Sequence, residues 1–403
     1  MLSKKKVSNK FVKQNLETIL LQINGADEAQ TFNEYKDKLN NLYAGFRLNF
    51  MQGSNEVQLA KSLHDYLWHD KPWRFTSKQH NLLIGIDRQL GEGRSVGNCQ
   101  VMTQLYSILG NRLGLDLYVL VSESHIMSIL RSGKKWNRHY TNIENTKADG
   151  FGLVFNYHNR GYARFDLNGL VASSHVNHSL FERYDKGDLD NAIKESLQAI
   201  EYADLDVAYS NFFLLLKKVP DKSKVLEYLD KGLKLNPYLP QFYYERGLLK
   251  YNEKCYKEAV KDFKKTLFLA RYLDYKQDFK KFRLSFGKNP LNIEGSFIEA
   301  YKYSGLANLK LKRHRQALKN FNDAAKINLS LDTLPEKTIS LLLNSKKYKL
   351  AISLYDKLLE KREDPSFYYA IAVLNDLLGK KDTAKEYLDI ADNLPLSNPL
   401  FNI

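Results

Sequence analysis

Small side chains recur at regular intervals through the second half of the chain. They are separated by 33, 34, 58, 34 and 33 residues, at Ala192, Val225, Ala259, Ala317, Ala351 and Ala384. A second small or apolar residue follows each of them after seven positions, at Ala199, Gly232, Thr266, Ala324, Leu358 and Ala391. A helical hairpin of about 34 residues cannot bury its own apolar face, so such hairpins stack and share one core. The repeat therefore predicts an all-α solenoid over residues 173–403.

This period resembles that of tetratricopeptide repeats. We expect six units, at residues 173–206, 206–239, 240–273, 298–331, 332–364 and 365–398, with an insertion at about 275–297 in the one long interval. The resemblance implies a protein or peptide partner, bound along the first helix of each repeat. Candidate groove residues are Tyr244, Tyr251, Lys302 and Tyr369; the alternative is that the tyrosines pack between repeats.

A second pattern begins at Gly97-Asn98-Cys99-Gln100. Apolar residues spaced three to four apart predict a helix that starts at Cys99 and ends at Gly114. The free N–H groups and the positive end of the dipole at a helix N-terminus favour a thiolate, and so does a nearby histidine. Cys99 is therefore a candidate nucleophile.

Polar residues that could assist this thiol follow in the chain. Residues 117–121 and 124–130 are typical of strands, and His125 lies at the start of the second. Asn142 and Glu144 alternate onto one face of a later strand. The order supplies a nucleophile, a base and an orienting group.

These residues carry a resemblance to the bacterial transglutaminase-like superfamily, which has a papain-like core. Gly-Asn-Cys opens a helix, Ser-His opens a strand, and Asn-Ile-Glu-x-Thr lies on a later strand. The resemblance implies that Cys99 is the nucleophile, that His125 is the base and later the acid, and that Glu144 fixes the imidazole. Asn142 is an alternative third member, because an amide oxygen can accept the same hydrogen bond, and Asp166 is a reserve for the acidic role.

The expected fold is α+β followed by all-α. An N-terminal helical segment (1–56) precedes a transglutaminase-like domain of helices and a small antiparallel sheet (57–172), and the tetratricopeptide array occupies 173–403. Ser124 departs from the family, in which many members have glycine before the histidine. No upstream residue is evident that would complete an oxyanion hole, so only the Cys99 N–H is assigned to it.

The composition of the chain indicates which cellular compartment and which classes of partner to expect. Cys99 and Cys255 are the only cysteines and fall in different expected domains, which argues against a disulfide framework and for a reducing compartment. No long apolar run or leader pattern is evident, so we expect a cytoplasmic protein without membrane contact. The net charge of +15 raises nucleic acid as a partner, but lysines alternate with acidic residues, as in Lys257–Asp262, which is typical of a solvated helix face.

Other site types receive little support from the sequence. Histidine and tryptophan between residues 64 and 73 lack the spacing of metal ligands and are expected to pack in the core. The glycines in Gly91–Arg94 are not followed by a Lys-Ser/Thr pair, so they do not form a P-loop. We therefore expect no metal, no cofactor and no sequence-specific nucleic acid, and we expect a protein or peptide partner that is acidic if charge guides it.

Two functions remain. In the first, the protein is a cysteine hydrolase or acyltransferase that acts on amide bonds of a protein or peptide, and the repeats recruit the substrate or partner. In the second, the thiol domain is catalytically silent and the protein is an adaptor that works through its repeats. The sequence favours the enzyme, because all three residue types of the triad are present, but it leaves open the substrate and the choice between hydrolysis and amine transfer.

Overall fold

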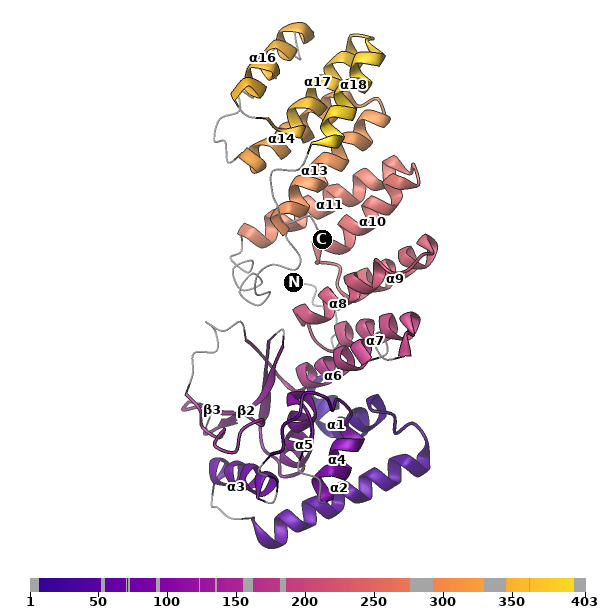
Figure 1. Ribbon diagram of the computed structural model, residues 1–403. Helices are drawn as coiled ribbons and strands as arrows, with labels where there is room; N and C mark the ends of the chain where they lie inside the picture. Colours follow the sequence, from indigo (N-terminus) through magenta and orange to yellow (C-terminus); the bar gives the residue numbers. More distant parts are fainter. Residues whose placement is uncertain are drawn as a thin grey trace. The chain divides into compact units, whose positions relative to one another are not determined.

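The computed structural model describes residues 7–51, 55–69, 71, 73–91, 95–122, 124–134, 136–154, 162–181, 186–275, 293–329, 346–361 and 363–394 (Figure 1). The chain divides into two compact units, with the boundary between Asp221 and Lys222.

The first unit is built around one buried helix. Its helices before the sheet are α1 (Asn9–Ile23), α2 (Ala29–Asn49), α3 (Glu56–Trp68), α4 (Leu82–Leu90) and α5 (Cys99–Arg112). Every residue of α5 from Gln100 to Gly110 is buried, and α1, α3 and α4 all contact it. A helix that is enclosed on all sides cannot rotate or slide without disturbing several neighbours. The position of its first residue, Cys99, is therefore fixed by the core.

A small antiparallel sheet lies against this helix. Its strands are β1 (Leu117–Val121), β2 (Ile126–Ser132), β3 (His139–Ile143) and β4 (Ala163–Phe165), in the order β3-β2-β1-β4. Successive residues of β1 face opposite sides of the sheet. Val119 approaches Gly169 on the helical side, whereas Leu120 joins Met127 and Ile129 in a separate apolar cluster. The expected small sheet is present, with its second strand starting two residues later than the sequence pattern suggested.

Three further helices complete the first unit: α6 (Leu167–Phe181), α7 (Leu189–Tyr202) and α8 (Asp206–Leu216). The first expected repeat starts at residue 173, which is inside α6, and α6 itself packs against α1, α5 and β1. The α6–α7 hairpin is thus continuous with the core that holds α5 and the sheet.

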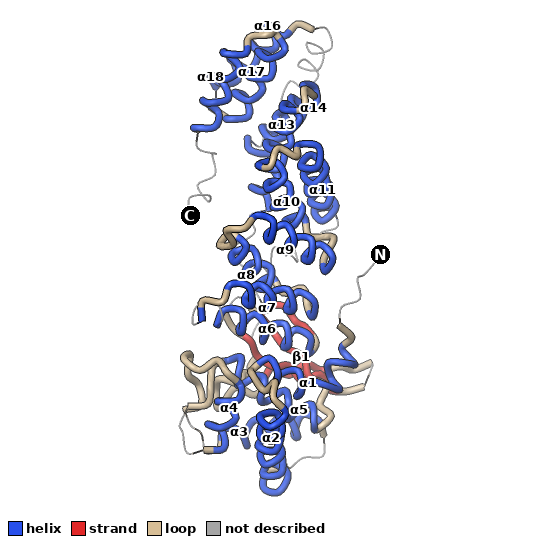
Figure 2. Tube along the Cα trace, turned by 90° about the vertical axis from the view of Figure 1, so that its right-hand side faces the viewer, coloured by secondary structure: helices blue, strands red, loops and turns tan. Residues whose placement is uncertain are grey.

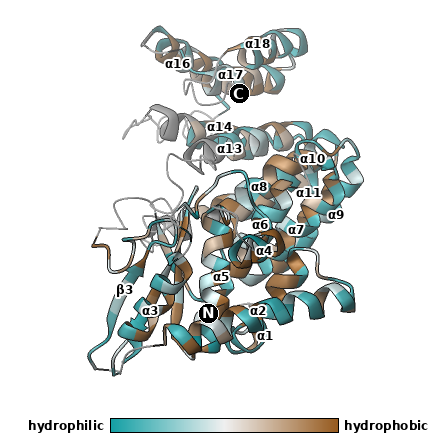
Figure 3. Cartoon of the chain, turned by 60° about the horizontal axis from the view of Figure 1, so that its bottom comes forward, coloured by the Kyte–Doolittle hydropathy of each residue, from teal (hydrophilic) through white to brown (hydrophobic). Residues whose placement is uncertain are grey.

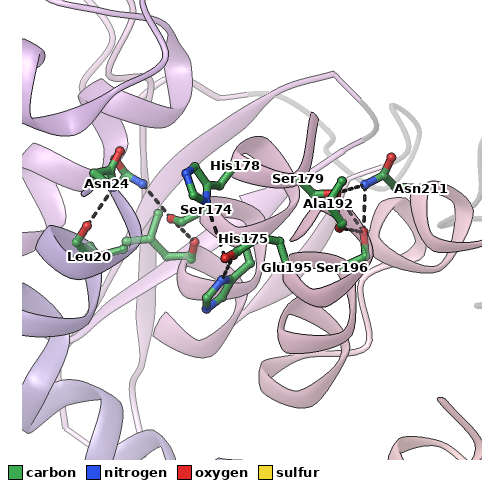
Figure 4. Close-up of polar contacts among 12 residues, drawn as sticks. Leu20, Asn24, Ser174, His175, His178, Ser179, Ala192, Glu195, Ser196 and Asn211 are labelled. Carbon is green, nitrogen blue, oxygen red and sulfur yellow. Dashed lines mark hydrogen bonds and ion pairs between the residues drawn. The ribbon is translucent and has the colours of Figure 1, made fainter. Parts of the chain in front are cut away.

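Buried polar groups join α6 to α7 and α8, as Figure 4 shows. The Ser179 hydroxyl donates to the carbonyl of Ala192 at 2.8 Å, and the Asn211 amide donates to Ser179 and Ser196 at 2.7 and 3.0 Å. These hydrogen bonds run between helices inside the core, where unpaired polar groups are costly. They specify the packing of this first hairpin.

The second unit is an array of helical hairpins. Its described helices are α9 (Lys222–Leu235), α10 (Pro240–Asn252), α11 (Tyr256–Tyr275), α13 (Ile293–Lys310), α14 (His314–Leu329), α16 (Tyr348–Lys361), α17 (Pro365–Leu377) and α18 (Lys381–Asn393). Figure 2 shows the pairs α10–α11, α13–α14 and α17–α18 side by side. Hydrophobic and hydrophilic residues alternate along α16 and α18 in Figure 3, as expected for helices with one face in a core. Most of the expected insertion (276–292) and the first helix of the fifth expected repeat (330–345) lie outside the described residues.

The repeated small residues are buried in both units. All six positions that recur near every 34 residues have 9% exposure or less. Four of them, Ala192, Ala259, Ala317 and Ala384, lie in the second helix of a hairpin that the structure describes. Small side chains let neighbouring helices approach closely. The tetratricopeptide-type arrangement predicted from the period is therefore present in the described hairpins.

Glycines in the first helices provide a second set of close contacts. A Cβ atom at Gly247 would lie 2.8 Å from the Phe263 ring, and one at Gly305 would lie 2.6 Å from the Phe321 ring. Both aromatic rings are 0% exposed. Phe321 also stacks on Tyr369, with ring centroids 5.1 Å apart, so its ring cannot move aside freely.

We expect Gly305→Ala to destabilise the second unit, although alanine favours a helix over glycine by about 1 kcal/mol. Forcing a methyl group into a filled core costs about 1–3 kcal/mol. Urea denaturation followed by helical circular dichroism measures the change, and Lys310→Ala, an exposed change on the same helix, is the control. A Gly305→Ala protein as stable as the control would contradict this packing.

Candidate functional site

Asn98 fixes the start of α5. Its side-chain Oδ1 accepts a hydrogen bond from the Val101 N–H at 3.0 Å, and its carbonyl accepts one from Met102. Asparagine is among the preferred N-cap residues because it satisfies free N–H groups in this way. A Cβ atom at Gly97 would lie 2.6 Å from the Val101 side chain, so only glycine fits before the cap. Cys99 follows as the first helical residue, with a half-buried thiol.

Thr103 and Asn145 bring the beginning of α5 to the sheet. Thr103 lies one turn after Cys99, on the same face of the helix, and its hydroxyl donates to the Ile126 carbonyl at 3.3 Å. The buried Asn145 amide donates to Thr103 at 3.2 Å and to Ser128 at 2.9 Å. The first turn of α5 is therefore held beside the start of β2 and the end of β3.

The antiparallel register of β2 and β3 places a histidine beside a carboxylate. Ser128 pairs with Ile143, so His125, just before β2, lies diagonally across from Glu144, just after β3. His125 Nε2 lies 2.7 Å from Glu144 Oε2. The other carboxylate oxygen, Oε1, accepts hydrogen bonds from the Thr146 N–H at 3.1 Å and hydroxyl at 2.6 Å. Glu144 is thus held at both oxygens.

The Cys99 thiol lies near the same histidine, because it is among the groups that raise the pKa of the His125 ring. The Glu144 contact uses Nε2, so Nδ1 is the ring nitrogen left for the thiol. Burial disfavours a charged ring, but hydrogen bonds to Cys99 and Glu144 and attraction to their charges outweigh it and raise the pKa of His125 to about 10. Burial likewise opposes the Glu144 charge, yet the bonds from His125 and Thr146 hold the pKa of Glu144 below its usual value. The arrangement favours an imidazolium next to a carboxylate.

The alternative third members lie elsewhere. The Asn142 amide nitrogen donates to the carbonyl of Leu153 at 2.9 Å, whereas Nε2 of His125 is held by Glu144. Asp166 accepts a hydrogen bond from the Asn168 N–H at 3.0 Å at the start of α6, and burial raises the pKa of its carboxyl group. The residue beside His125 is Glu144.

A buried basic residue lies near the segment that leads into α5, and the sequence did not single it out. Arg74 is 1% exposed; its Nε donates to Gln89 at 3.2 Å, and its guanidinium carbon lies 5.3 Å from the centre of the Trp68 ring. The Arg74 carbonyl accepts from Val96 and Gly97. His64 is buried beside it, and burial together with the Arg74 charge lowers the pKa of His64 to about 4. Trp73, expected in the core, is 70% exposed.

The candidate groove residues of the second unit differ among themselves. Tyr369 is 1% exposed and donates to Asp392 at 2.5 Å, so it belongs to the core and its assignment to an open groove is corrected. Tyr244 and Tyr251 pack partly against the core formed by Ala259, Phe263 and Ala300. Lys302 is half-buried, with Nζ 5.5 Å from the centre of the Tyr303 ring and 5.4 Å from that of Tyr369.

No group of three or more His, Cys, Asp or Glu side chains in the described ranges is arranged to hold a metal ion. No helix within those ranges has the length and apolar character needed to cross a membrane.

Comparison with known proteins gives little beyond the repeats. No family model matches the chain, and no curated protein matches it. Among solved structures, the chain is similar to PilF of Pseudomonas aeruginosa (16% identity, 54% of this chain and 88% of that one, TM-score 0.29). It is also similar to YrrB, described as a TPR protein with an unusual peptide-binding site (23% identity, 49% and 90%, TM-score 0.29). Menin, whose structure is described as revealing a binding site for Mixed Lineage Leukemia protein, matches over 95% of this chain and 88% of its own (14% identity, TM-score 0.35). TM-scores this low support no conclusion about function.

We expect Glu144→Gln to lower the pKa of His125, because the neutral amide no longer stabilises the imidazolium. The raised value, about 10 against ~6.5 in an unfolded chain, means that protonated His125 stabilises the fold fully below pH ~6.5 and that this stabilisation is lost as the pH rises through 10. Titration of the His125 ring by NMR measures the pKa. The difference in melting temperature between wild type and Glu144→Gln should also be larger at pH 6 than at pH 10.

Asn142→Ala is the matched control for this titration. Its side chain bonds to Leu153 and not to His125, so we expect the raised His125 pKa to persist. An unchanged His125 titration in Glu144→Gln would remove Glu144 from the site.

Proposed function

We propose that the protein is a transglutaminase-like cysteine hydrolase or acyltransferase that acts on amide bonds of a protein or peptide. The observation that supports this most directly is the chain of contacts from Cys99 through His125 to Glu144. The thiol is half-buried at a helix N-terminus, where a developing negative charge is stabilised. One ring nitrogen of the histidine faces the thiol and the other faces a carboxylate, which is the arrangement of an activated nucleophile.

In the proposed reaction, the Cys99 sulfur attacks the carbonyl carbon of an amide. A C–S bond forms and the π electrons of the carbonyl move onto its oxygen. When the C=O bond re-forms, the C–N bond breaks and the His125 imidazolium donates its proton to the leaving amine. Water or a second amine then attacks the thioester with His125 as base. Glu144 keeps the ring oriented and stabilises its charge throughout.

Alkylation tests the thiol directly. Iodoacetamide reacts with thiolates, and both a helix N-terminus and a neighbouring imidazolium favour a thiolate. We expect iodoacetamide to modify Cys99 much faster than Cys255 at pH 6. Peptide mass spectrometry of the full-length protein separates the two rates.

His125→Ala should remove this difference while leaving the modification of Cys255 unchanged, because Cys255 is exposed in the other unit. Equal and slow modification of both cysteines in the wild-type protein at pH 6 would contradict the proposed thiolate.

A second candidate function is that of an adaptor that binds peptides through the repeats. The observation that favours it is a set of buried and half-buried polar side chains on α10 and α13. Glu299 is 8% exposed, and its Oε1 has no hydrogen-bond partner among the described residues. Burial raises the pKa of Glu299, although the charge of Lys302 opposes this. Tyr244 and Tyr303 lie close to the same carboxylate.

Lys302 suits an extended peptide that carries a carboxylate, to which its ammonium group would donate a hydrogen bond. Tyrosine rings provide contact area at low cost in side-chain entropy. In the enzyme proposed above, the same face would recruit the substrate; in an adaptor it would be the whole function.

We expect Lys302→Ala to weaken the binding of acidic peptides roughly tenfold or more, since a hydrogen bond to a charged group contributes about 1.5–3 kcal/mol. Fluorescence anisotropy with matched acidic and neutral peptides measures the affinity. Lys310→Ala removes an exposed charge from the same helix and should have little effect. Equal losses in the two variants would attribute binding to net charge and not to this face.

A further inference from the structure

The hydrogen bonds of Asn98 determine which way its amide points. Its Oδ1 must face the Val101 N–H, at 3.0 Å, because an NH2 group cannot accept a hydrogen bond. The Nδ2 group therefore faces the neighbour on the other side, which is His80 Nδ1 at 2.8 Å. In this pair the amide is the donor and the ring nitrogen the acceptor.

This assignment also fixes the tautomer of His80. A neutral imidazole that accepts at Nδ1 carries its proton on Nε2. His80 is exposed, so its Nε2–H is available to a bound molecule. The residue immediately after Asn98 is Cys99. The His80 ring is therefore one hydrogen bond away from the residue that precedes Cys99, and it carries its proton on the nitrogen that Asn98 does not use.

The backbone around His80 is anchored on both sides. The Gln79 carbonyl accepts from the Asn98 N–H at 2.9 Å, and the His80 carbonyl accepts from the Asn177 amide of α6 at 3.1 Å. The next residue, Asn81, caps α4 by accepting from Leu83 at 2.9 Å. His80 is therefore preorganised, which a donor to a transient charge requires.

Among the described residues, the other groups near Cys99 are less suitable than His80 as a second donor. The backbone N–H of Cys99 makes no hydrogen bond to the residues that the structure describes, so it is one donor. The Gln79 amide nitrogen also lacks a described partner, but it is enclosed and Gln79 is only 7% exposed. His125 has one nitrogen bound to Glu144 and serves the thiol in the reaction proposed above. His80 remains as the accessible side-chain donor.

We propose that His80 is a catalytic residue whose Nε2–H, together with the Cys99 N–H, stabilises the oxyanion formed when Cys99 attacks a carbonyl group. This inference rests on the cysteine chemistry proposed above. With p-nitrophenyl acetate, sulfur forms a bond to the carbonyl carbon and the π electrons move to oxygen, where the two N–H groups donate. Re-formation of the C=O bond expels p-nitrophenolate with its electron pair and leaves an acetylated Cys99.

Two reactions of the full-length protein separate the oxyanion from the thiolate. Acetylation by p-nitrophenyl acetate passes through an oxyanion, whereas alkylation by iodoacetamide is a direct displacement and does not. We expect His80→Ala to slow acetylation of Cys99 by about 10²-fold, the usual effect of losing one oxyanion donor, and to leave alkylation within about twofold. His80→Gln, which keeps an N–H at a similar distance along the side chain, should restore part of the acetylation rate.

His139→Ala, which removes another exposed histidine of the same unit, should change neither rate. Unchanged acetylation in His80→Ala would overturn the assignment of His80. An equal loss of acetylation and alkylation would also overturn it, because His80 would then act on the reactivity of the Cys99 thiol and not on the oxyanion. If wild-type Cys99 is neither acetylated nor rapidly alkylated, the proposed cysteine chemistry itself fails, and this inference fails with it.

Discussion

The hydrogen bond from the Val101 N–H to Asn98 Oδ1 determines where the chemistry of the first unit can lie. It begins α5 at Cys99, and because α5 is buried along almost its whole length, that starting point cannot shift. The same bond turns the Asn98 amide nitrogen toward His80. Gly97 is required because any side chain there would collide with Val101. One carboxamide therefore sets the position of the thiol, the free N–H groups around it and the tautomer of its neighbour.

Histidine–carboxylate pairs alone do not identify a site in this molecule. His175 Nδ1 lies 2.6 Å from Glu195, and His178 lies 3.5 Å from the same carboxylate, a cluster seen in Figure 4. Burial opposes the charge on Glu195, but the two histidines lower its pKa to about 2. His175 also stacks on Tyr202. These histidines tie α6 to α7, whereas His125 lies beside the Cys99 thiol.

Local patterns in the sequence were sufficient to predict the helix at Cys99, the strand at Leu117–Val121 and the helices that carry the periodic small residues. Each of these depends on residues close together in the chain. The choice among Glu144, Asn142 and Asp166 was not accessible, because it depends on the register of β2 with β3 and on which backbone groups compete for each side chain. His80 was missed for the same reason: it lies 18 positions before Asn98, and only the fold brings them together. The prediction that Tyr369 lines a groove was wrong, because the sequence alone does not distinguish a tyrosine that is buried with an acidic partner from an exposed one.

Helix α6 contains the start of the first expected repeat and also packs against α5, the helix that begins at Cys99. Gln100, the residue after Cys99, accepts from Ser173 at 2.7 Å and donates to Ser174 at 2.9 Å, and Gln104 donates to Ser174 at 2.7 Å. These contacts are buried, and the polar groups on α5 would lose their partners if α6 were interrupted. A truncation after residue 172 would cut α6 (Leu167–Phe181) and expose them. Single substitutions on the α10 and α13 face therefore test the proposed recruitment by the repeats more cleanly than a cut at residue 172, which would disturb α5 as well.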